Sequence, residues 1–309
     1  MKKLILSLVI LVMAASLTAQ VSVWDGSYEE FDASNGKGLT EDNPILIENA
    51  AQLAFMSQQF YSANNKKYYK LTTDIDLNYL PWTAIGLLGN STFYGYFDGG
   101  NHSISKLEFA LFSYAQGYIK NLTITGKVET RYWQAGGIVA YVDLSAVAPI
   151  EGSQHVVIEN CVNKATIKAG DNNAGGMISD FNSNGTDYLY IINCVNYGTI
   201  STVSASSYAG GIAGRLQKDA IVKGCVNYGE INGTSYSGGV VAYPRTNVNI
   251  VDCFNVGNVN GTGERLGGIS GYSSGGSIYN CYNLGTVTGN NYMGGIIGRL
   301  KGASVVNAY

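Results

Sequence analysis

The hydrophobic positions of this chain recur in short bursts rather than in helical stripes. In residues 110–309 the apolar runs are about five residues long at most, and Gly, Asn, Ser and Thr separate them. Short apolar runs bounded by turn residues predict β-strands, and they leave no room for the ten or so periodic residues that a helix needs. This part of the chain is therefore predicted to be all β.

Two motifs recur through the same region at a nearly constant interval. A Gly-Gly pair followed by apolar residues begins at Gly136, Gly175, Gly210, Gly238, Gly267 and Gly294. An Asn-Cys-x-Asn type motif is centred on Cys161, Cys194, Cys225, Cys253 and Cys281, with intervals of 33, 31, 28 and 28 residues. Short repeated strands can bury their apolar side only by stacking one unit on the next. We therefore predict a parallel β-helix with coils of about 28 residues, a length that favours the right-handed form.

Stacked coils would place like residues in columns about 4.8 Å apart. The cysteines are predicted to be five buried free thiols, because parallel neighbours point the same way and cannot reach the torsion of a disulfide. The Asn two residues after each Cys is predicted to lie in a turn, with left-handed backbone angles and an amide that bonds coil to coil. The paired glycines are predicted where the chain turns tightly or where two backbones approach closely.

Residues 1–19 have the build of a secretory signal peptide. Two lysines precede an apolar run from Leu4 to Ala15, and a small residue, Ala19, stands at the expected cleavage point. The run is shorter than the roughly 20 residues that span a bilayer. The mature chain is therefore predicted to begin near Gln20 and to be exported to the bacterial cell surface or the extracellular space.

Residues 20–109 differ from the repeats and are predicted to form an N-terminal cap with the first strands of the solenoid. Asn49 and Gln52 have capping-box spacing, and apolar residues follow at helical intervals. One amphipathic helix is therefore predicted over roughly residues 49–62. With Trp82, this helix is expected to cover the open end of the coil stack, because an uncovered end would expose apolar side chains.

Several segments resemble bacterial surface proteins that carry the GLUG motif. The similarity rests on residues 71–77, 93–104 and 110–113 and on the two repeat motifs. That family is similar to segments of large adhesin-like surface proteins and to the non-catalytic region of some immunoglobulin-A peptidases. The resemblance implies a β-helical extracellular module and transfers no catalytic residue. The repeats of residues 110–309 stop midway through a unit, which predicts further coils or domains beyond them.

Composition and charge narrow the class of function. The 309 residues include 40 Gly and 23 Tyr, only 13 % are charged, and the formal net charge is -3. No cationic stripe is present to bind phosphates, so nucleic acid is not an expected partner, and no cofactor is expected. Asp74 and Asp76 are a weak candidate for Ca²⁺, but a strand-end turn is favoured because no third acidic ligand is nearby.

Tyrosine columns are the main candidates for ligand binding. The column two residues before the Gly-Gly pairs includes Tyr208, Tyr236, Arg265 and Tyr292, and a second column, three residues after Cys, contains Tyr197 and Tyr228. Aromatic rows at coil spacing give flat amphipathic faces for sugars or for a protein partner.

Two adjacent coils also carry longer connections between the Gly-Gly pair and the next Cys. These are loops at residues 142–154 and 180–190, and the second contains Asp187, Tyr188 and Tyr190. Insertions on one edge of a solenoid often mark its binding surface.

The favoured function is a non-catalytic adhesion or recognition module for glycans or for host or partner proteins. One alternative is a carbohydrate-active enzyme of the β-helix type. Three or more acids with Arg or Lys in one groove would favour that alternative, but the acids of the coil region do not share columns in adjacent coils. The other alternative is the stalk of a larger surface peptidase.

Overall fold

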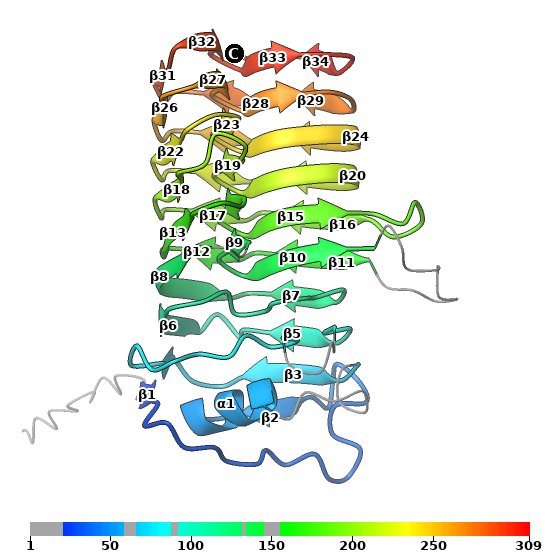
Figure 1. Ribbon diagram of the computed structural model, residues 1–309. Coiled ribbons are helices and arrows are strands. Elements are labelled where there is room, and N and C mark those ends of the chain that lie inside the picture. Colours follow the sequence, from blue (N-terminus) through cyan, green and yellow to red (C-terminus); the bar gives the residue numbers. More distant parts are fainter. Residues whose placement is uncertain (1–20, 59–65, 88–91, 132–133, 145–154) are drawn as a thin grey trace, which may run out of the picture.

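The computed structural model describes residues 21–58, 66–87, 92–131, 134–144 and 155–309. In these ranges the chain winds into a parallel β-helix whose coils stack from the N-terminal end at the bottom of Figure 1 to the C-terminal end at the top. Each strand pairs in parallel with the equivalent strands of the coils before and after it. The predicted solenoid is confirmed.

The strands form three sheets, here called sheets I, II and III. Sheet I contains β2 (Ile45–Ile47), β3 (Tyr68–Leu71), β5 (Tyr96–Asp98), β7 (Tyr118–Lys120), β10 (Val139–Asp143), β11 (Val156–Glu159), β15 (Ile178–Asn182), β16 (Leu189–Ile192), β20 (Ala213–Lys223), β24 (Val241–Val251), β28 (Ser270–Ser273), β29 (Ser277–Tyr279), β33 (Ile297–Leu300) and β34 (Ser304–Val306). Sheet II contains β1 (Ser22–Val23), β4 (Ile75–Asp76), β6 (Ser103–Leu107), β8 (Thr123–Thr130), β12 (Val162–Asn163), β13 (Thr166–Ala169), β17 (Val195–Asn196), β18 (Ile200–Thr202), β21 (Val226–Asn227), β22 (Ile231–Gly233), β25 (Phe254–Asn255), β26 (Val259–Gly261), β30 (Tyr282–Asn283) and β31 (Val287–Thr288). Sheet III contains β9 (Ala135–Gly136), β14 (Ala174–Gly175), β19 (Ala209–Gly210), β23 (Ser237–Gly238), β27 (Glu264–Gly267) and β32 (Asn291–Gly294).

The N-terminal end is covered by α1 (Ala50–Gln58), which lies beside β2 and β3 in Figure 1. The backbone N–H of Gln52 donates to Asn49 Oδ1 at 2.9 Å, so the predicted helix start is confirmed. Leu53 and Met56 of the helix belong to the same buried core as the coils. The predicted last turn, residues 59–62, lies outside the described residues, as does the predicted signal peptide.

The second glycine of each pair lies where successive coils touch, and the first lies in a tight turn, where a Cβ on Gly294 would be 2.0 Å from the carbonyl oxygen of Ile297 in the same coil. A Cβ on Gly211 would lie 2.1 Å from the carbonyl oxygen of Gly239 and 2.4 Å from Asn227 Cγ. A Cβ on Gly295, at the same repeat position in the last coil, would meet nothing within 4 Å. The neighbouring coil therefore imposes glycine here, which confirms the predicted close approach of two backbones.

The asparagines two residues after each cysteine form a buried ladder. Asn163 Nδ2 donates to Asn196 Oδ1 at 2.7 Å, and the same bond recurs from coil to coil as far as Asn283. Each amide also holds its own turn, as where Asn196 Nδ2 donates to the carbonyl of Gly198 at 2.8 Å. The predicted bonding of amides between coils is confirmed, and it satisfies polar groups that have no access to water.

The left-handed backbone does not lie where the sequence predicted it. It occurs one residue before the cysteine, with φ of 51° at Asn160, 52° at Asn193 and 52° at Asn280. The Asn after the cysteine instead ends a short strand of sheet II, as Asn163 does in β12. The corner between sheets I and II thus needs the positive φ, which explains why Asn, Asp or Gly precedes each cysteine.

The five cysteines form an inner column of free, fully buried thiols. The backbone N–H of Cys225 lies 3.4 Å from Cys253 Sγ, and Cys194 Sγ lies 3.5 Å from the carbonyl oxygen of Ile158. Burial raises the pKa of Cys194 and of Cys253, so these thiols stay protonated at neutral pH.

A colorimetric thiol reagent is expected to detect none of these cysteines in the native protein and all five after unfolding without reductant. Burial denies the reagent access, and reaction needs a thiolate that burial disfavours. A count of one or three in the unfolded protein would show disulfides and contradict this arrangement.

Candidate functional site

Tyrosines and arginines line one corner of the solenoid, where sheet III meets sheet I. The first column, at the start of the sheet III strands, consists of Tyr208, Tyr236, Arg265 and Tyr292. The second column, on the outward side of sheet I, consists of Arg215, Tyr243, Tyr272 and Arg299, with Arg245 two residues beyond Tyr243. These nine residues are called the Tyr-Arg face.

The rings of the Tyr-Arg face touch both along the columns and between them. Tyr208 lies 4.9 Å from Tyr236 in its own column and 5.1 Å from Tyr243 in the other, measured between ring centroids. Tyr243 and Tyr272 stack at 5.0 Å with an interplanar angle of 11°. Because coil stacking fixes their spacing, these rings form a continuous aromatic surface that does not have to be ordered by a ligand.

Each arginine of the Tyr-Arg face lies over a tyrosine ring. The guanidinium carbon is 5.5 Å from the Tyr208 centroid for Arg215, 4.6 Å from the Tyr236 centroid for Arg265, and 5.4 Å from the Tyr272 centroid for Arg299. Arg245 lies 5.6 Å from the centroid of Tyr243. These cation-π contacts help to fix the orientation of the planar guanidinium groups.

Two of the four arginines are neutralised by carboxylates. Asp180 is fully buried in β15, and it accepts hydrogen bonds from Arg215 Nε at 2.9 Å and from Asn173 Nδ2 at 3.1 Å. Burial raises the pKa of Asp180, while the bonds from Arg215 act in the opposite direction. Arg265 Nη1 lies 3.2 Å from Glu264 Oε1.

The other two arginines give the Tyr-Arg face a surplus of positive charge. Within the described ranges, no carboxylate lies within ion-pair distance of Arg245 or Arg299. The whole chain carries a formal net charge of -3, so the positive charge of this face is opposite in sign to the charge of the chain as a whole. It therefore favours an anionic ligand.

The backbone of the first column is also unusual. Tyr236, Arg265 and Tyr292 adopt left-handed conformations with φ of 48°, 69° and 52°. Such angles cost of the order of 1 kcal/mol for a bulky residue, and they concentrate at ligand-binding sites. The tight corner before the last three Gly-Gly pairs thus helps to set the direction of these side chains.

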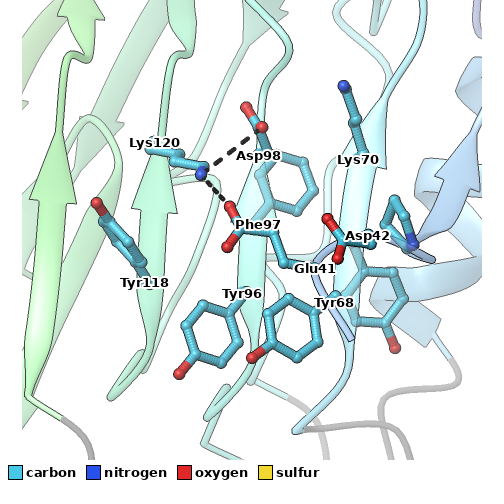
Figure 2. A pocket seen from close by; sticks show the side chains of 11 residues that line it. Glu41, Asp42, Tyr68, Lys70, Tyr96, Phe97, Asp98, Tyr118 and Lys120 are labelled. Atoms are coloured by element: carbon cyan, nitrogen blue, oxygen red, sulfur yellow. Dashed lines mark hydrogen bonds and ion pairs between the residues drawn. The ribbon is translucent and has the colours of Figure 1, made fainter. Parts of the chain in front are cut away.

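A separate pocket of about 320 Å³ lies on sheet I near the N-terminal end (Figure 2). Tyr68, Tyr96 and Tyr118 come from the neighbouring strands β3, β5 and β7. The rings of Tyr68 and Tyr96 are parallel within 3°, with centroids 4.1 Å apart, and Tyr118 meets Tyr96 edge-on at 6.0 Å. This N-terminal pocket therefore has an aromatic floor made by three successive strands.

Charged side chains surround that floor. Lys120 Nζ lies 2.6 Å from Glu41 Oε1 and 4.0 Å from Asp98 Oδ2, the two contacts drawn as dashed lines in Figure 2. Asp42 and Lys70 complete the charged rim. The hydrogen bond to Glu41 raises the pKa of Lys120. Burial, together with a hydrogen bond that the Tyr118 hydroxyl donates to Glu159, raises the pKa of Tyr118.

The remaining predicted binding residues lie elsewhere. Tyr197 and Tyr228 stack at 5.0 Å on the turns that follow β17 and β21, and about half of each side chain is exposed. Asp187 is buried and accepts a hydrogen bond from Asn184 Nδ2 at 2.7 Å, so it holds its own loop together.

The rings of Tyr188 and Tyr190 gather around His155, with centroid separations of 6.0 Å and 5.3 Å. Within the first predicted loop, residues 145–154 lie outside the described residues.

Asp74 and Asp76 are occupied by protein groups. Asp74 Oδ1 accepts from the backbone N–H of Ser103 at 2.7 Å, which lowers the pKa of Asp74. Asp76 accepts from the backbone N–H of Asn78 at 2.7 Å and pairs with Lys106 at 2.7 Å. Across the part of the chain that the structure describes, no cluster of three or more potential metal ligands occurs. This geometry agrees with the strand-end turn that the sequence favoured.

Sequence reasoning missed half of the Tyr-Arg face and the entire N-terminal pocket, although both leave periodic signals. The second column lies five residues after the first glycine of the last four pairs, where Arg215, Tyr243, Tyr272 and Arg299 stand. The pocket residues come from a Tyr-x-charged pattern that repeats at Tyr68-Tyr69-Lys70, Tyr96-Phe97-Asp98 and Tyr118-Ile119-Lys120. Alternation along a strand places both members of each pair on one face.

The fold and the columns define a repeat solenoid with surface rows of aromatic and charged residues. Residues 262–288 match the GLUG motif family. The fold is similar to the crystal structure of a "putative immunoglobulin A1 protease" from Bacteroides ovatus, with 24 % sequence identity and a TM-score of 0.71 over 86 % of this chain and 85 % of that chain. No curated protein sequence matches the chain significantly.

Proposed function

We propose that the protein is an exported recognition module that binds acidic glycans at the Tyr-Arg face without catalysis. The observation that carries this proposal is the pairing of stacked tyrosine rings with arginines that lack carboxylate partners among the described residues. The stacked tyrosines offer apolar ring edges against which the C–H groups of a sugar can pack, and guanidinium groups bind carboxylates or sulfates with two parallel hydrogen bonds. A charged polysaccharide offers both features along its length.

The repeat geometry suits an extended ligand. Coils lie about 4.8 Å apart along the solenoid axis, close to the step of one sugar residue in an extended glycan. Tyr243 and Tyr272 occupy successive coils, and Arg299 follows in the next one. An extended glycan that runs parallel to the axis would therefore meet a ring or a cation at each step.

Export to the cell surface is part of the same proposal. The GLUG motif match and the expected signal peptide at residues 1–19 support it. In the described ranges, no helix has the length and hydrophobicity to span a membrane.

A carbohydrate-active enzyme is a second candidate, because the N-terminal pocket gathers three carboxylates and two lysines. Proton abstraction there would need a side chain that is unprotonated at neutral pH. The raised pKa values of Lys120 and Tyr118 keep both groups protonated. Neither Lys120 nor Tyr118 can therefore act as the base, and glycoside hydrolysis in this pocket would have to use the carboxylates of Glu41, Asp42 and Asp98.

Immobilised protein is expected to bind polygalacturonate, heparin or polysialic acid with an affinity that falls as the salt concentration rises. Replacing Arg245 and Arg299 together by alanine should weaken binding at least about tenfold, because each charged hydrogen-bonded contact contributes roughly 1.5 kcal/mol or more. Biolayer interferometry measures both effects.

The matched control replaces Lys127 and Lys168, two exposed lysines of sheet II, by alanine. This variant loses the same charge but should retain its affinity. Equal losses in both double variants, or no binding of any acidic polymer, would contradict the assignment of the Tyr-Arg face.

A further inference from the structure

We propose that the N-terminal pocket is a second, independent binding site and that its ligand is a neutral pyranose. The pocket is lined by eleven residues, and its volume of about 320 Å³ suits one or two sugar rings. Its composition differs from that of the Tyr-Arg face, because it contains no arginine and carries both signs of charge. The two sites therefore select different chemistry.

The aromatic floor supplies the surface on which a sugar ring stacks. Tyr68 and Tyr96 are half-buried, and their rings are parallel within 3° at 4.1 Å between centroids. Figure 2 shows the two rings next to one another, below the carboxylates of Glu41 and Asp98 in that view. Because the two rings stack on one another, their edges form this surface. The C–H groups of a pyranose can pack against these apolar edges while its hydroxyl groups are directed toward the rim.

The rim offers both kinds of hydrogen-bonding partner that hydroxyl groups need. The carboxylates of Glu41, Asp42 and Asp98 accept hydrogen bonds, and the ammonium groups of Lys70 and Lys120 donate them. A cationic ligand would meet the two lysines, and an anionic ligand would meet the three carboxylates. A neutral polyhydroxylated ring is the class of ligand that both sets bind without repulsion.

Two of the polar groups of the rim, Lys120 and Asp98, are held in place before any ligand arrives. Lys120 contacts Glu41 at 2.6 Å and lies 5.5 Å from the centroid of the Tyr118 ring. Asp98 accepts from the backbone N–H of Gly100 at 2.9 Å and from Asn121 Nδ2 at 3.0 Å. Such preorganisation reduces the side-chain entropy that the protein loses when a small ligand binds.

Titration calorimetry with the methyl glycosides of glucose, galactose and mannose tests this site, with galacturonate and spermidine as charged comparators. At least one neutral glycoside should bind with a Kd of about 1 mM, a usual range for a single sugar ring. Tyr96→Ala should weaken that binding at least about tenfold, because it removes the central one of the three tyrosines of the aromatic floor. Tyr279→Ala, an exposed tyrosine of sheet I outside the pocket, should not.

Asp42→Asn keeps the test decisive if Tyr96→Ala does not fold. Asp42 is exposed and forms no hydrogen bond or ion pair with the described residues, so its substitution should leave stability unchanged while weakening glycoside binding about threefold or more. The double replacement of Arg245 and Arg299 should leave glycoside binding intact, which separates this site from the Tyr-Arg face. Binding of galacturonate or spermidine alone, no binding of any neutral glycoside, or unchanged affinity in Asp42→Asn would overturn the proposal.

Discussion

Replacing Gly211 by alanine is expected to lower the free energy of unfolding by about 3 to 5 kcal/mol. The new methyl group would lie 2.1 Å from the carbonyl oxygen of Gly239 and 2.4 Å from Asn227 Cγ. Both atoms belong to neighbouring coils that are held by the sheets and by the asparagine ladder, so neither can move without breaking hydrogen bonds. The midpoint of urea unfolding, followed by circular dichroism, measures the loss.

Gly295→Ala is the matched control for this prediction. Gly295 occupies the same repeat position in the last coil, where a Cβ would meet nothing within 4 Å. Its replacement should change stability by less than about 0.5 kcal/mol. Similar losses in the two variants would show that local backbone conformation, and not contact with the next coil, requires glycine at this position.

Arg215→Ala is expected to destabilise the protein by about 3 to 5 kcal/mol at neutral pH, because it leaves a buried carboxylate without its cation. Asp180 is fully buried, and Arg215 contacts it through Nε at 2.9 Å as well as through Nη2. Asn173 and Gln217 would remain as donors, at 3.1 Å and 3.3 Å, but neither carries a charge. Arg245→Ala removes an arginine of the same face that has no buried partner, so it should be nearly neutral for stability.

The loss caused by Arg215→Ala should also depend on pH. Burial already raises the pKa of Asp180, and removing the guanidinium raises that pKa further. A carboxyl whose folded pKa exceeds its unfolded value destabilises the fold as pH rises through that folded pKa, and it regains a proton and the lost stability as pH falls. Urea unfolding at about pH 8 and about pH 5 should therefore show a smaller loss at the lower pH. A loss that is equal at both values would contradict this role of Asp180.

The sequence was sufficient to predict the coil stack because burial leaves few alternatives. Cysteines, glycines and asparagines recur at a common interval. Burial of the thiols, close approach at the glycines and hydrogen bonds between the amides are possible together only if equivalent residues of successive coils lie over one another. The left-handed corner was assigned to the wrong position because asparagines stand on both sides of Cys161, Cys194 and Cys281, and asparagine tolerates positive φ in either place. Only the position of the corner between sheets I and II distinguishes Asn160 from Asn163.

The site was less predictable because its rows mix residue types. Tyr208 and Tyr236 could be aligned by their distance from the glycines, but their neighbours Tyr243 and Tyr272 share a column with Arg215 and Arg299. A column that contains different residue types does not appear as a repeated motif in the sequence. Burial of Asp180 was not predictable either, since an acid on an outward-facing position of a strand is normally solvated.

A crystal structure with a bound acidic oligosaccharide, chosen as the tightest binder among the polymers named above, tests the central claim most directly. The account predicts a chain that runs along the solenoid axis, with sugar rings on Tyr243 and Tyr272 and acidic groups about 3 Å from the guanidinium groups of Arg245 and Arg299. An oligosaccharide bound away from the Tyr-Arg face, with both of these arginines unoccupied, would contradict it.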